Sequence, residues 1–339
     1  MSTPLTPPLP QALPCVVGAS RRIREAAEQV ELIAQTEATC LLLGETGTGK
    51  ELFARAIHYL SPRKHLPFVP VNCGAIPDAL FENEIFGHVR GAYTDARSEE
   101  TGLLAYAGNG TLFLDEVDAL SAAAQVKLLR VLQEQEYRPI GSARTYHTDV
   151  RVVAATNCDL RHCVACRTFR EDLFHRLNVL RLTIPPLRDR AEDIPLLVSH
   201  FVKEFADRHR RPVRGIEQDA TSRLMAYRWP GNVRELQGVL QRAVLLARGD
   251  SIVTADLDLP GNEMAGNPAE AAAGQPFENS LKSAKEIVVR QFELSYLANV
   301  LRLSEGNVSR AARMAGKERR SFQRLLRKYC IVVTSFRST

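Results

Sequence analysis

Long apolar segments are missing from this chain of 339 residues. No apolar run approaches the roughly 18 residues that a membrane-spanning helix needs, so we expect no contact with a membrane. The Pro-rich start, MSTPLTPPLPQALP, lacks both the basic and the apolar region of a signal peptide. The seven cysteines are odd in number and scattered, which excludes a disulfide scaffold and is typical of thiols in a reducing compartment. We therefore expect a cytoplasmic protein.

Positive charge is concentrated at the C-terminal end. From Leu281 to Thr339, 13 Lys and Arg stand against 4 Asp and Glu, whereas the rest of the chain has 31 against 35. A basic end on a mildly acidic body is typical of a segment that binds a polyanion, usually nucleic acid. A solvated charged surface explains the charge alone equally well.

Short aliphatic runs recur in the first half of the chain, separated by stretches with helical periodicity. The runs are Cys40 to Leu43, Phe68 to Val71, Thr111 to Leu114, Val150 to Ala155 and Val179 to Ile184. Such runs are typical of a parallel sheet buried on both faces, so the predicted fold class is α/β.

Beyond Pro186 the strand pattern disappears, and helical periodicity remains in Ile194 to Arg208 and in Asp219 to Tyr227. A stretch rich in Pro, Gly and Ala then has no core-forming pattern, which is typical of a linker. The predicted organisation is a Pro-rich leader (1–15), an α/β domain (16–185), a small helical domain (186–258), a flexible linker (259–277) and a helical C-terminal domain (278–339).

A glycine-rich motif follows the first aliphatic run. It reads Gly44-Glu45-Thr46-Gly47-Thr48-Gly49-Lys50, and helical sequence begins at Glu51. A glycine-rich turn between strand and helix lets backbone N–H groups face a phosphate, while Lys50 supplies a cation. The motif therefore predicts a loop that binds ATP, with a purely structural turn as the alternative. Because Glu51 replaces the usual Ser or Thr ligand of Mg²⁺, the metal needs an acid elsewhere.

Two carboxylates end the third aliphatic run, in Gly110-Thr111-Leu112-Phe113-Leu114-Asp115-Glu116. We expect Asp115 to hold Mg²⁺, directly or through water, and Glu116 to polarise the water that attacks the γ-phosphate. Acids at a strand end are often merely solvated, but together with a phosphate loop they predict ATP hydrolysis.

Two helical patterns joined by a tight turn occupy the basic end. Gly306 to Gly316 predicts one amphipathic helix and Lys317 to Tyr329 a second, in which Phe322 is spaced to face the core. This is the helix-turn-helix pattern of DNA-binding proteins, with a solvated basic helix as the alternative. The residues left to contact DNA are Arg310, Arg313, Lys317, Arg319, Arg320, Gln323, Arg324, Arg327 and Lys328.

Three cysteines, Cys158, Cys163 and Cys166, lie beside His162 with a spacing that can ligate zinc or an iron–sulfur cluster. Partly buried thiols on a helix are the interpretation we favour.

These motifs and several others resemble those of bacterial enhancer-binding proteins, the AAA+ ATPases that activate sigma-54 RNA polymerase. The resemblance runs from about Val16 to Ala247 and resumes at about Phe292, where the chain is similar to a Fis-type domain. It implies an AAA+ P-loop core, a helical lid and a Fis-type helix-turn-helix. The most specific segments are GETGTGKE (44–51), FVPVNC (68–73), FGHVRGAYTDA (86–96), GTLFLDE (110–116), FREDLFHRLNV (169–179), PPLRDRAEDIP (185–195) and WPGNVREL (229–236).

The resemblance also implies roles at the nucleotide. Asn72 resembles the switch residue that hydrogen-bonds the catalytic Glu116 and releases it when the γ-phosphate is sensed. Thr156 and Asn157 occupy the first sensor position, and Arg234 that of the second sensor. Two further ATP-binding positions, where the family's N-terminal segment passes the adenine, are Val17 and Gly18.

Arg170 and Arg176 resemble arginines that reach into the neighbouring subunit's nucleotide, which implies a hexameric ring of one or of two kinds of chain. Taken alone, either arginine is more typical of a surface salt bridge.

The segment Gly91-Ala92-Tyr93-Thr94-Asp95-Ala96 aligns with the family's loop that contacts sigma-54, usually GAFTGA. Tyr93 keeps the aromatic ring, whereas Asp95 in place of glycine adds charge and restricts the backbone. The resemblance implies contact with the sigma-54 RNA polymerase holoenzyme; an exposed connector without a partner is the alternative.

We therefore predict an ATP-hydrolysing transcription activator that uses ATP and Mg²⁺, binds upstream enhancer DNA and remodels the sigma-54 closed complex. The alternatives are a DNA-binding regulator with the AAA+ fold that makes no sigma-54 contact, and a ring ATPase acting on other proteins. Because about 15 residues precede the ATPase domain, too few for a receiver domain, we expect regulation by expression level or by a regulatory protein in trans.

Overall fold

The computed structural model divides into two units, residues 1–262 and 263–339, which are treated separately below. The described residues are 16–93, 98–259, 297, 300, 301, 304, 307–315 and 322. Within this part of the chain, no helix is both long and apolar enough to cross a bilayer.

The first unit is built on a five-stranded parallel sheet with the strand order β2-β5-β8-β1-β9. The five aliphatic runs of the sequence form these strands, which confirms the predicted α/β class. β8 is buried along its whole length because helices cover both faces of the sheet. The strands are β1 (Cys40–Leu43), β2 (Phe68–Asn72), β5 (Thr111–Asp115), β8 (Arg151–Thr156) and β9 (Leu180–Thr183).

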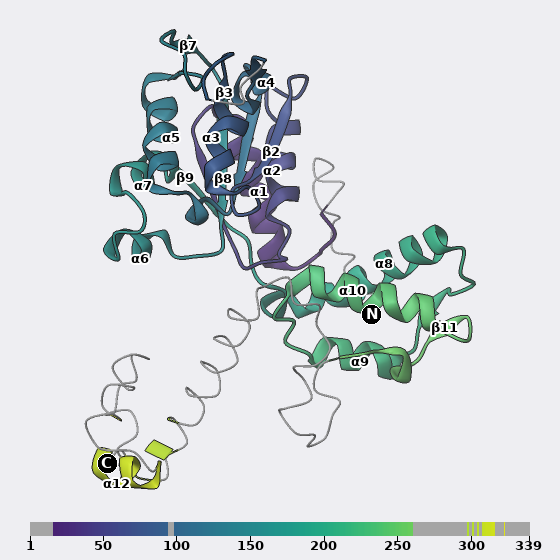
Figure 1. Ribbon diagram of the computed structural model, residues 1–339. Coiled ribbons are helices and arrows are strands. Elements are labelled where there is room, and N and C mark those ends of the chain that lie inside the picture. Colours follow the sequence, from purple (N-terminus) through teal and green to yellow (C-terminus); the bar gives the residue numbers. More distant parts are fainter. Residues whose placement is uncertain are drawn as a thin grey trace. The chain divides into compact units, whose positions relative to one another are not determined.

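Alternate strand residues enter two separate cores. Leu41 of β1 packs with the helices on one face, and Leu42 packs with those on the other, which explains the continuous apolar run. Figure 1 shows α1 and α2 on one side of the sheet and α5 and α7 on the other. The helices are α1 (Arg21–Ala34), α2 (Lys50–Tyr59), α3 (Asp78–Phe86), α4 (Leu103–Ala107), α5 (Ala122–Glu134), α6 (Leu160–Ala165), α7 (Glu171–Leu177) and the 3-10 turn η1 (Val117–Ala119).

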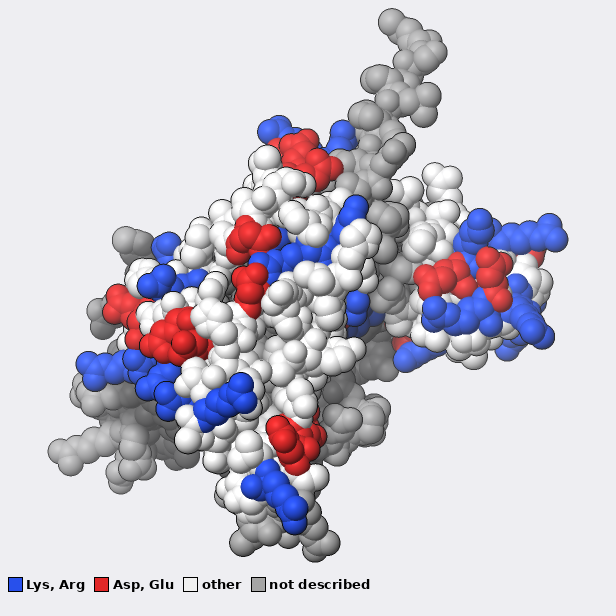
Figure 2. Space-filling model, turned by 90° about the horizontal axis from the view of Figure 1, so that it is seen from above, with Lys and Arg blue, Asp and Glu red and all other residues white. Residues whose placement is uncertain are grey.

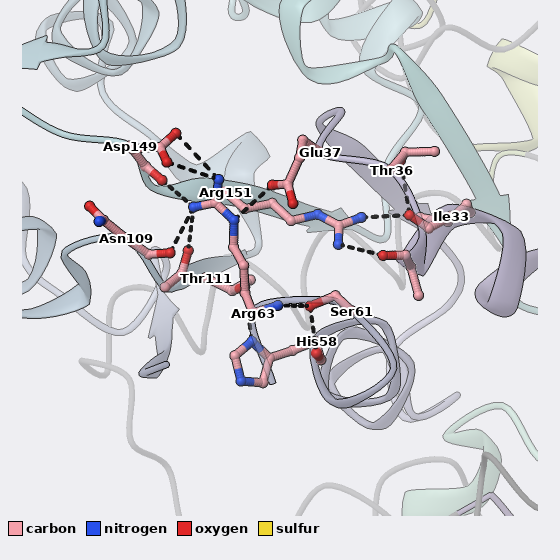
Figure 3. A network of polar contacts seen from close by, with 12 residues as sticks. Ile33, Thr36, Glu37, His58, Ser61, Arg63, Asn109, Thr111, Asp149 and Arg151 are labelled. Carbon is pink, nitrogen blue, oxygen red and sulfur yellow. Dashed lines mark hydrogen bonds and ion pairs between the residues drawn. The ribbon is translucent and has the colours of Figure 1, made fainter. Parts of the chain in front are cut away.

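A polar network holds the edge of the sheet where β5 and β8 begin (Figure 3). The buried Arg151 donates to the carbonyls of Ile33 (2.7 Å) and Ala34 (3.3 Å) and so caps the C-terminus of α1. Arg63 pairs with Glu37 (2.7 Å) and Asp149 (3.2 Å). These contacts tie α1, the end of α2 and two strand starts into one frame.

The second part of this unit is a helical lid around the fully buried Trp229, whose Nε1 donates to the carbonyl of Leu224 (2.8 Å). We expected no strands between Pro186 and about Ala247, and this is wrong at one place, because β10 lies in that range and pairs with β11 in parallel. Two residues each are too few to leave a periodic signal. The elements are η2 (Leu187–Asp193), α8 (Ile194–His209), β10 (Gly215–Ile216), α9 (Gln218–Ala226), α10 (Asn232–Leu246), β11 (Ser251–Ile252) and η3 (Thr254–Asp256).

The second unit contains α12 (Val308–Met314), with Asn307 as its N-cap. Ala311, Ala312 and Phe322 are buried in a small apolar cluster, as the helical spacing predicts for Phe322.

Acidic and basic side chains intermingle over the face shown in Figure 2. This mixture agrees with the near balance of charges outside the C-terminal segment.

Candidate active site

The glycine-rich motif forms the turn between β1 and α2, so that α2 begins at Lys50. Gly47 and Gly49 have φ angles of 80° and 97°, in the left-handed region that favours glycine. A Cβ on Gly47 would lie 2.2 Å from the carbonyl oxygen of Gly231 in the lid. The loop therefore requires glycine both for its own turn and for the close approach of the lid.

Lys50 is buried within this loop. Its Nζ donates to the carbonyls of Gly44 (2.9 Å) and Glu45 (3.3 Å). Burial lowers the pKa of Lys50, and the nearby Asp115 and Glu116 oppose that shift. The cation therefore lies between the loop carbonyls and the strand-end carboxylates, where it can reach a bound phosphate.

Asp115 and Glu116 lie at the carboxyl end of β5, next to the end of β2, where Asn72 pairs with Asp115. The N–H of Glu116 donates to Asp115 Oδ1 (3.0 Å), and Glu116 has a left-handed φ of 55°. A Cβ on Gly74 would lie 2.4 Å from Glu116 Oε2. The Glu116 carboxylate thus occupies space that only a glycine at position 74 leaves open.

Asn72 lies beside Glu116, but its side chain has other partners in this structure. Its Oδ1 accepts from the N–H groups of Gly74 (2.9 Å) and Ala75 (3.1 Å). Between the described residues Asn72 and Glu116 there is no hydrogen bond, so the switch contact implied by the resemblance stays a prediction.

The two residues at the first sensor position contact different neighbours. Thr156 donates to Asp118 Oδ1 (2.5 Å), and Asn157 Nδ2 donates to Thr46 Oγ1 in the phosphate loop (2.9 Å). Asn157 therefore links the end of β8 to the phosphate loop. Asp118 was not singled out in the sequence, because one acid in a short turn carries no pattern.

Two adjoining cavities lie between the phosphate loop and the lid. One, of about 400 Å³, is lined by Lys50, Asn72, Asp115, Glu116 and Arg234, among others. The other, of about 220 Å³, is lined by Val17, Thr48, Phe53, His200 and Phe201, among others. A polar, charged space beside a more apolar one suits the phosphates and the base of a nucleotide.

Gly18 lies outside both linings, against Asp193, which is fully buried at the end of η2. Asp193 Oδ1 accepts from the N–H groups of Ala19 (2.6 Å) and Ser20 (2.7 Å). The segment before α1 is thereby fixed to the lid beside the smaller cavity. Asp193 was missed because an acid in a charged sequence looks solvated.

Arg170 is exposed at the N-cap of α7 and Arg176 is exposed on the helix itself, and both lie outside the two cavities. Arg170 pairs with Asp172 (2.6 Å). The structure therefore places neither arginine at this chain's own phosphate loop.

The predicted polymerase loop is described up to Tyr93; Thr94, Asp95 and Ala96 lie outside the described residues. It lies in the segment that connects β3 (Gly87–His88) to β4 (Glu100–Thr101), two strands that pair antiparallel. Tyr93 is half exposed, and its ring centre is 5.0 Å from that of His88. The turn between β6 (Glu136–Tyr137) and β7 (Tyr146–His147) lies close by, since a Cβ on Gly141 would be 2.7 Å from Ala92 Cβ.

Of the predicted DNA contacts, Arg310 and Arg313 are exposed on α12, away from the buried Ala311 and Ala312. The other predicted contacts lie outside the described residues; they are Lys317, Arg319, Arg320, Gln323, Arg324, Arg327 and Lys328.

The three cysteines lie at and around α6. Cys163 is a partly buried thiol on the helix, as expected, but Cys158 and Cys166 are exposed and lie outside it, so the expectation is wrong for these two. Burial is the main cause that raises the pKa of the Cys158 thiol to about 11, and Cys166 Sγ is 3.5 Å from His162 Nε2. Among the residues that the structure describes, no group of three or more His, Cys, Asp or Glu is arranged to hold a metal ion.

Two residues of the lid that sequence reasoning did not single out contact the phosphate loop. Arg188 makes a bidentate ion pair with Glu45 (2.7 and 2.5 Å), and Asn232 Nδ2 donates to the carbonyl of Thr46 (3.1 Å). Both lie in segments that resemble the family, PPLRDRAEDIP (185–195) and WPGNVREL (229–236). Those motifs were the sequence signal that could have identified the two residues.

Comparison with known proteins gives consecutive matches to three families. These are the sigma-54 interaction domain over residues 16–183, the AAA+ ATPase lid domain over 188–273, and the bacterial regulatory proteins of the Fis family over 288–329.

The chain is 45% identical over 310 residues to the transcriptional regulatory protein GlrR of Escherichia coli K12, covering 91% of this chain and 67% of GlrR. It is 45% identical over 299 residues to the regulatory protein AtoC of the same strain, covering 88% of this chain and 64% of AtoC. It thus spans about two thirds of the length of these relatives.

Among solved structures, NtrX from Brucella abortus in complex with ATP is similar, with a TM-score of 0.68 and 35% identity. That match covers 93% of this chain and 70% of NtrX. Since the family matches follow one another along the chain, GlrR is 45% identical to it and NtrX shares its fold, the chain belongs to the sigma-54-interacting AAA+ ATPases that regulate bacterial transcription.

Proposed function

We propose that this chain activates sigma-54-dependent transcription by hydrolysing ATP in the cavity between its phosphate loop and its lid. The observation that carries the proposal is the convergence of Lys50, Asp115 and Glu116 on one cavity. Lys50 binds the phosphates, and the Glu116 carboxylate, lodged against Gly74, orients the attacking water.

Mg²⁺ fits the donors that the chain offers. Asp115 uses Oδ1 for the N–H of Glu116, which leaves Oδ2 for a hard cation. Asp115 would hold the ion beside the phosphates, and the chemistry that Mg²⁺ would supply there is neutralisation of charge on the γ-phosphate. The family-specific Glu51 lines the same cavity and adds a second carboxylate near it.

The ATPase acts as a hexameric ring. This is supported by the exposure of Arg170 and Arg176, which lie outside this chain's own cavity, where a neighbour's nucleotide could reach them once Arg170 leaves its ion pair with Asp172. A guanidinium supplied by a neighbouring subunit stabilises γ-phosphate charge that the host subunit leaves uncovered. A regulatory protein in trans would act on ring assembly.

Movement at the cavity reaches the polymerase through the loop that begins at Gly91. The C-terminal unit holds the ring on enhancer DNA through its basic residues, in the cytoplasm, where the polymerase acts. The exposed Arg310 and Arg313 support this assignment, and binding is expected to weaken steeply with salt.

The test is transcription in vitro with purified sigma-54 holoenzyme on a promoter that carries an upstream enhancer. Open complexes are expected with ATP and absent with a non-hydrolysable analogue. Activation of the ordinary polymerase instead would favour the alternative, a DNA-binding regulator that makes no sigma-54 contact. ATP hydrolysis without any effect on either polymerase would overturn both.

A further inference from the structure

Asn232 is fully buried at the start of α10, where the lid meets the phosphate loop. Its Nδ2 donates to the carbonyl of Thr46 (3.1 Å) and to Glu45 Oε2 (3.2 Å). Its Oδ1 accepts from the N–H of Leu187 (2.7 Å). One side-chain amide therefore joins the phosphate loop, the first residue of η2 and the lid helix.

The backbone at this position is also unusual. Asn232 has a left-handed φ of 53°, and its N–H donates to the carbonyl of Trp229, whose own φ is 51°. Asn and Asp adopt this conformation more readily than other side chains, and strained positions persist where the surrounding structure holds them. The site is thus suited to an amide or a carboxyl side chain.

The next two residues bind the phosphate loop through their main chain. The N–H groups of Val233 and Arg234 donate to the carbonyl of Gly47 (3.0 and 3.3 Å). Because each peptide unit is planar and trans, fixing the carbonyls of Thr46 and Gly47 also fixes the N–H groups of Gly47 and Thr48. Phosphate loops offer such N–H groups to their ligand; in this structure that of Thr48 donates to the carbonyl of Glu45 (3.3 Å) within the turn.

Glu45 completes this contact. Both of its carboxylate oxygens accept from Arg188, and Oε2 accepts from Asn232 as well. The hydrogen bonds from Arg188, followed by that from Asn232, hold the pKa of Glu45 at about 2. A second negative charge at position 232 would therefore face an ionised Glu45.

We propose that Asn232 is a positioning residue for ATP, which orients the N–H groups of the phosphate loop by holding the Thr46 carbonyl against the lid. The inference rests on the proposed function, because it assumes that ATP binds at this loop. Asn232 does not line the larger cavity and acts through the loop.

The test is the nearly isosteric variant Asn232→Asp in the full-length chain. It keeps the acceptor for Leu187, removes the donor to Thr46 and places a carboxylate beside Glu45. At pH 8 the KM for ATP is expected to rise about tenfold while kcat changes less than about threefold, since one buried hydrogen bond is lost without loss of a catalytic group.

The pH profile separates positioning from simple loss of structure. Burial and the charge of Glu45 raise the pKa of the new carboxyl, so a larger fraction of it is protonated at pH 6 than at pH 8, and the protonated form can again donate a hydrogen bond. The ratio of the variant's KM to that of the unaltered protein is expected to shrink over this range. A ratio that stays constant overturns the proposal, as does an unchanged KM at pH 8.

Two further variants keep the test decisive. Asn109→Asp makes the same chemical change at an exposed site before β5, and its KM is expected to match that of the unaltered protein at each pH. Glu45→Gln changes a side chain that is partly exposed to solvent. Because the amide weakens the ion pair with Arg188, the KM for ATP is expected to rise about threefold. In the double variant Glu45→Gln/Asn232→Asp, the like-charge repulsion is relieved and the effects are expected to be less than additive.

Thermal unfolding shows whether Asn232→Asp folds. If it does not fold, the test is the KM of Glu45→Gln for ATP, and a KM equal to that of the unaltered protein overturns the proposal. Failure of the unaltered protein to hydrolyse ATP would overturn the proposed function instead.

Discussion

Asp193 accepts from Ser20 twice, at 2.7 Å from its main-chain N–H and at 2.7 Å from its hydroxyl. The Ser20 hydroxyl in turn accepts from the N–H of Ile23 as the N-cap of α1. One buried carboxylate in the lid thus determines where the first helix of the α/β domain starts.

Asp193→Asn is expected to lower the free energy of unfolding by about 2 kcal/mol, because a buried charged acceptor is lost and an N–H donor faces other donors. Thermal and urea unfolding measure the change. Asp189→Asn is the control, since Asp189 makes an exposed ion pair with Arg22 that contributes at most about 1 kcal/mol. Equal effects of the two variants would contradict this account.

Glu116→Gln is expected to lower kcat for ATP hydrolysis at least about 100-fold while ATP binding is retained, because the amide cannot accept the proton of the attacking water. Phosphate release and equilibrium ATP binding are the measurements. Glu134→Gln, at an exposed position at the end of α5, should leave both unchanged. Activity of Glu116→Gln near that of the unaltered protein would rule out Glu116 as the base.

Arg176→Ala and Lys50→Ala are each expected to be almost inactive alone but to regain activity when mixed. In a mixed ring, a Lys50→Ala subunit still supplies Arg176 to the intact phosphate loop of an Arg176→Ala neighbour. Phosphate release from the mixture, compared with the sum of the separate proteins, gives the result. A mixture no more active than that sum would place Arg176 outside the neighbour's site.

Thr94→Ala is expected to retain ATPase activity and to abolish sigma-54-dependent open complexes, because the change lies at the loop proposed to contact the polymerase. Tyr93→Phe keeps the ring beside His88 and serves as the matched variant, for which transcription should persist. Transcription by Thr94→Ala at the normal level would disprove this role of the loop.

The free energy of unfolding is expected to fall in mild acid, and His58 is one of the groups that cause this. Burial lowers the pKa of His58, whose Nδ1 lies 2.9 Å from Thr111 Oγ1. The unfolded chain binds a proton below pH 6.5, the ordinary value, while the folded chain resists it, so this part of the stability is present above pH 6.5 and is lost between 6.5 and the lowered native value. Urea midpoints of the unaltered protein and of His58→Gln at pH 7.5 and 5.5 test this, and the variant should lose less stability on acidification.

The sequence predicted the sheet well because each strand is a continuous aliphatic run between turns, and β1 has the predicted bounds. It also placed the strand-end acids, since Asp115 follows such a run directly. It could not reveal that Asn232 has a left-handed backbone or that Asp193 is buried, because both properties come from packing between segments far apart in the sequence. The sequence also did not predict the short strand pairs β3–β4, β6–β7 and β10–β11, because a strand of two residues is too short to show a periodic pattern.

The Arg63 and Arg151 network has a mechanical consequence (Figure 3). Arg151 at the start of β8 is hydrogen-bonded to the end of α1, and Arg63, just after α2, is paired with Asp149 just before β8. These contacts hold the starts of the strands in a fixed position relative to the helices beside them. If nucleotide turnover at the phosphate loop moves the chain, we therefore expect the displacement in the lid and in the loop that begins at Gly91, and little tilt of the sheet itself.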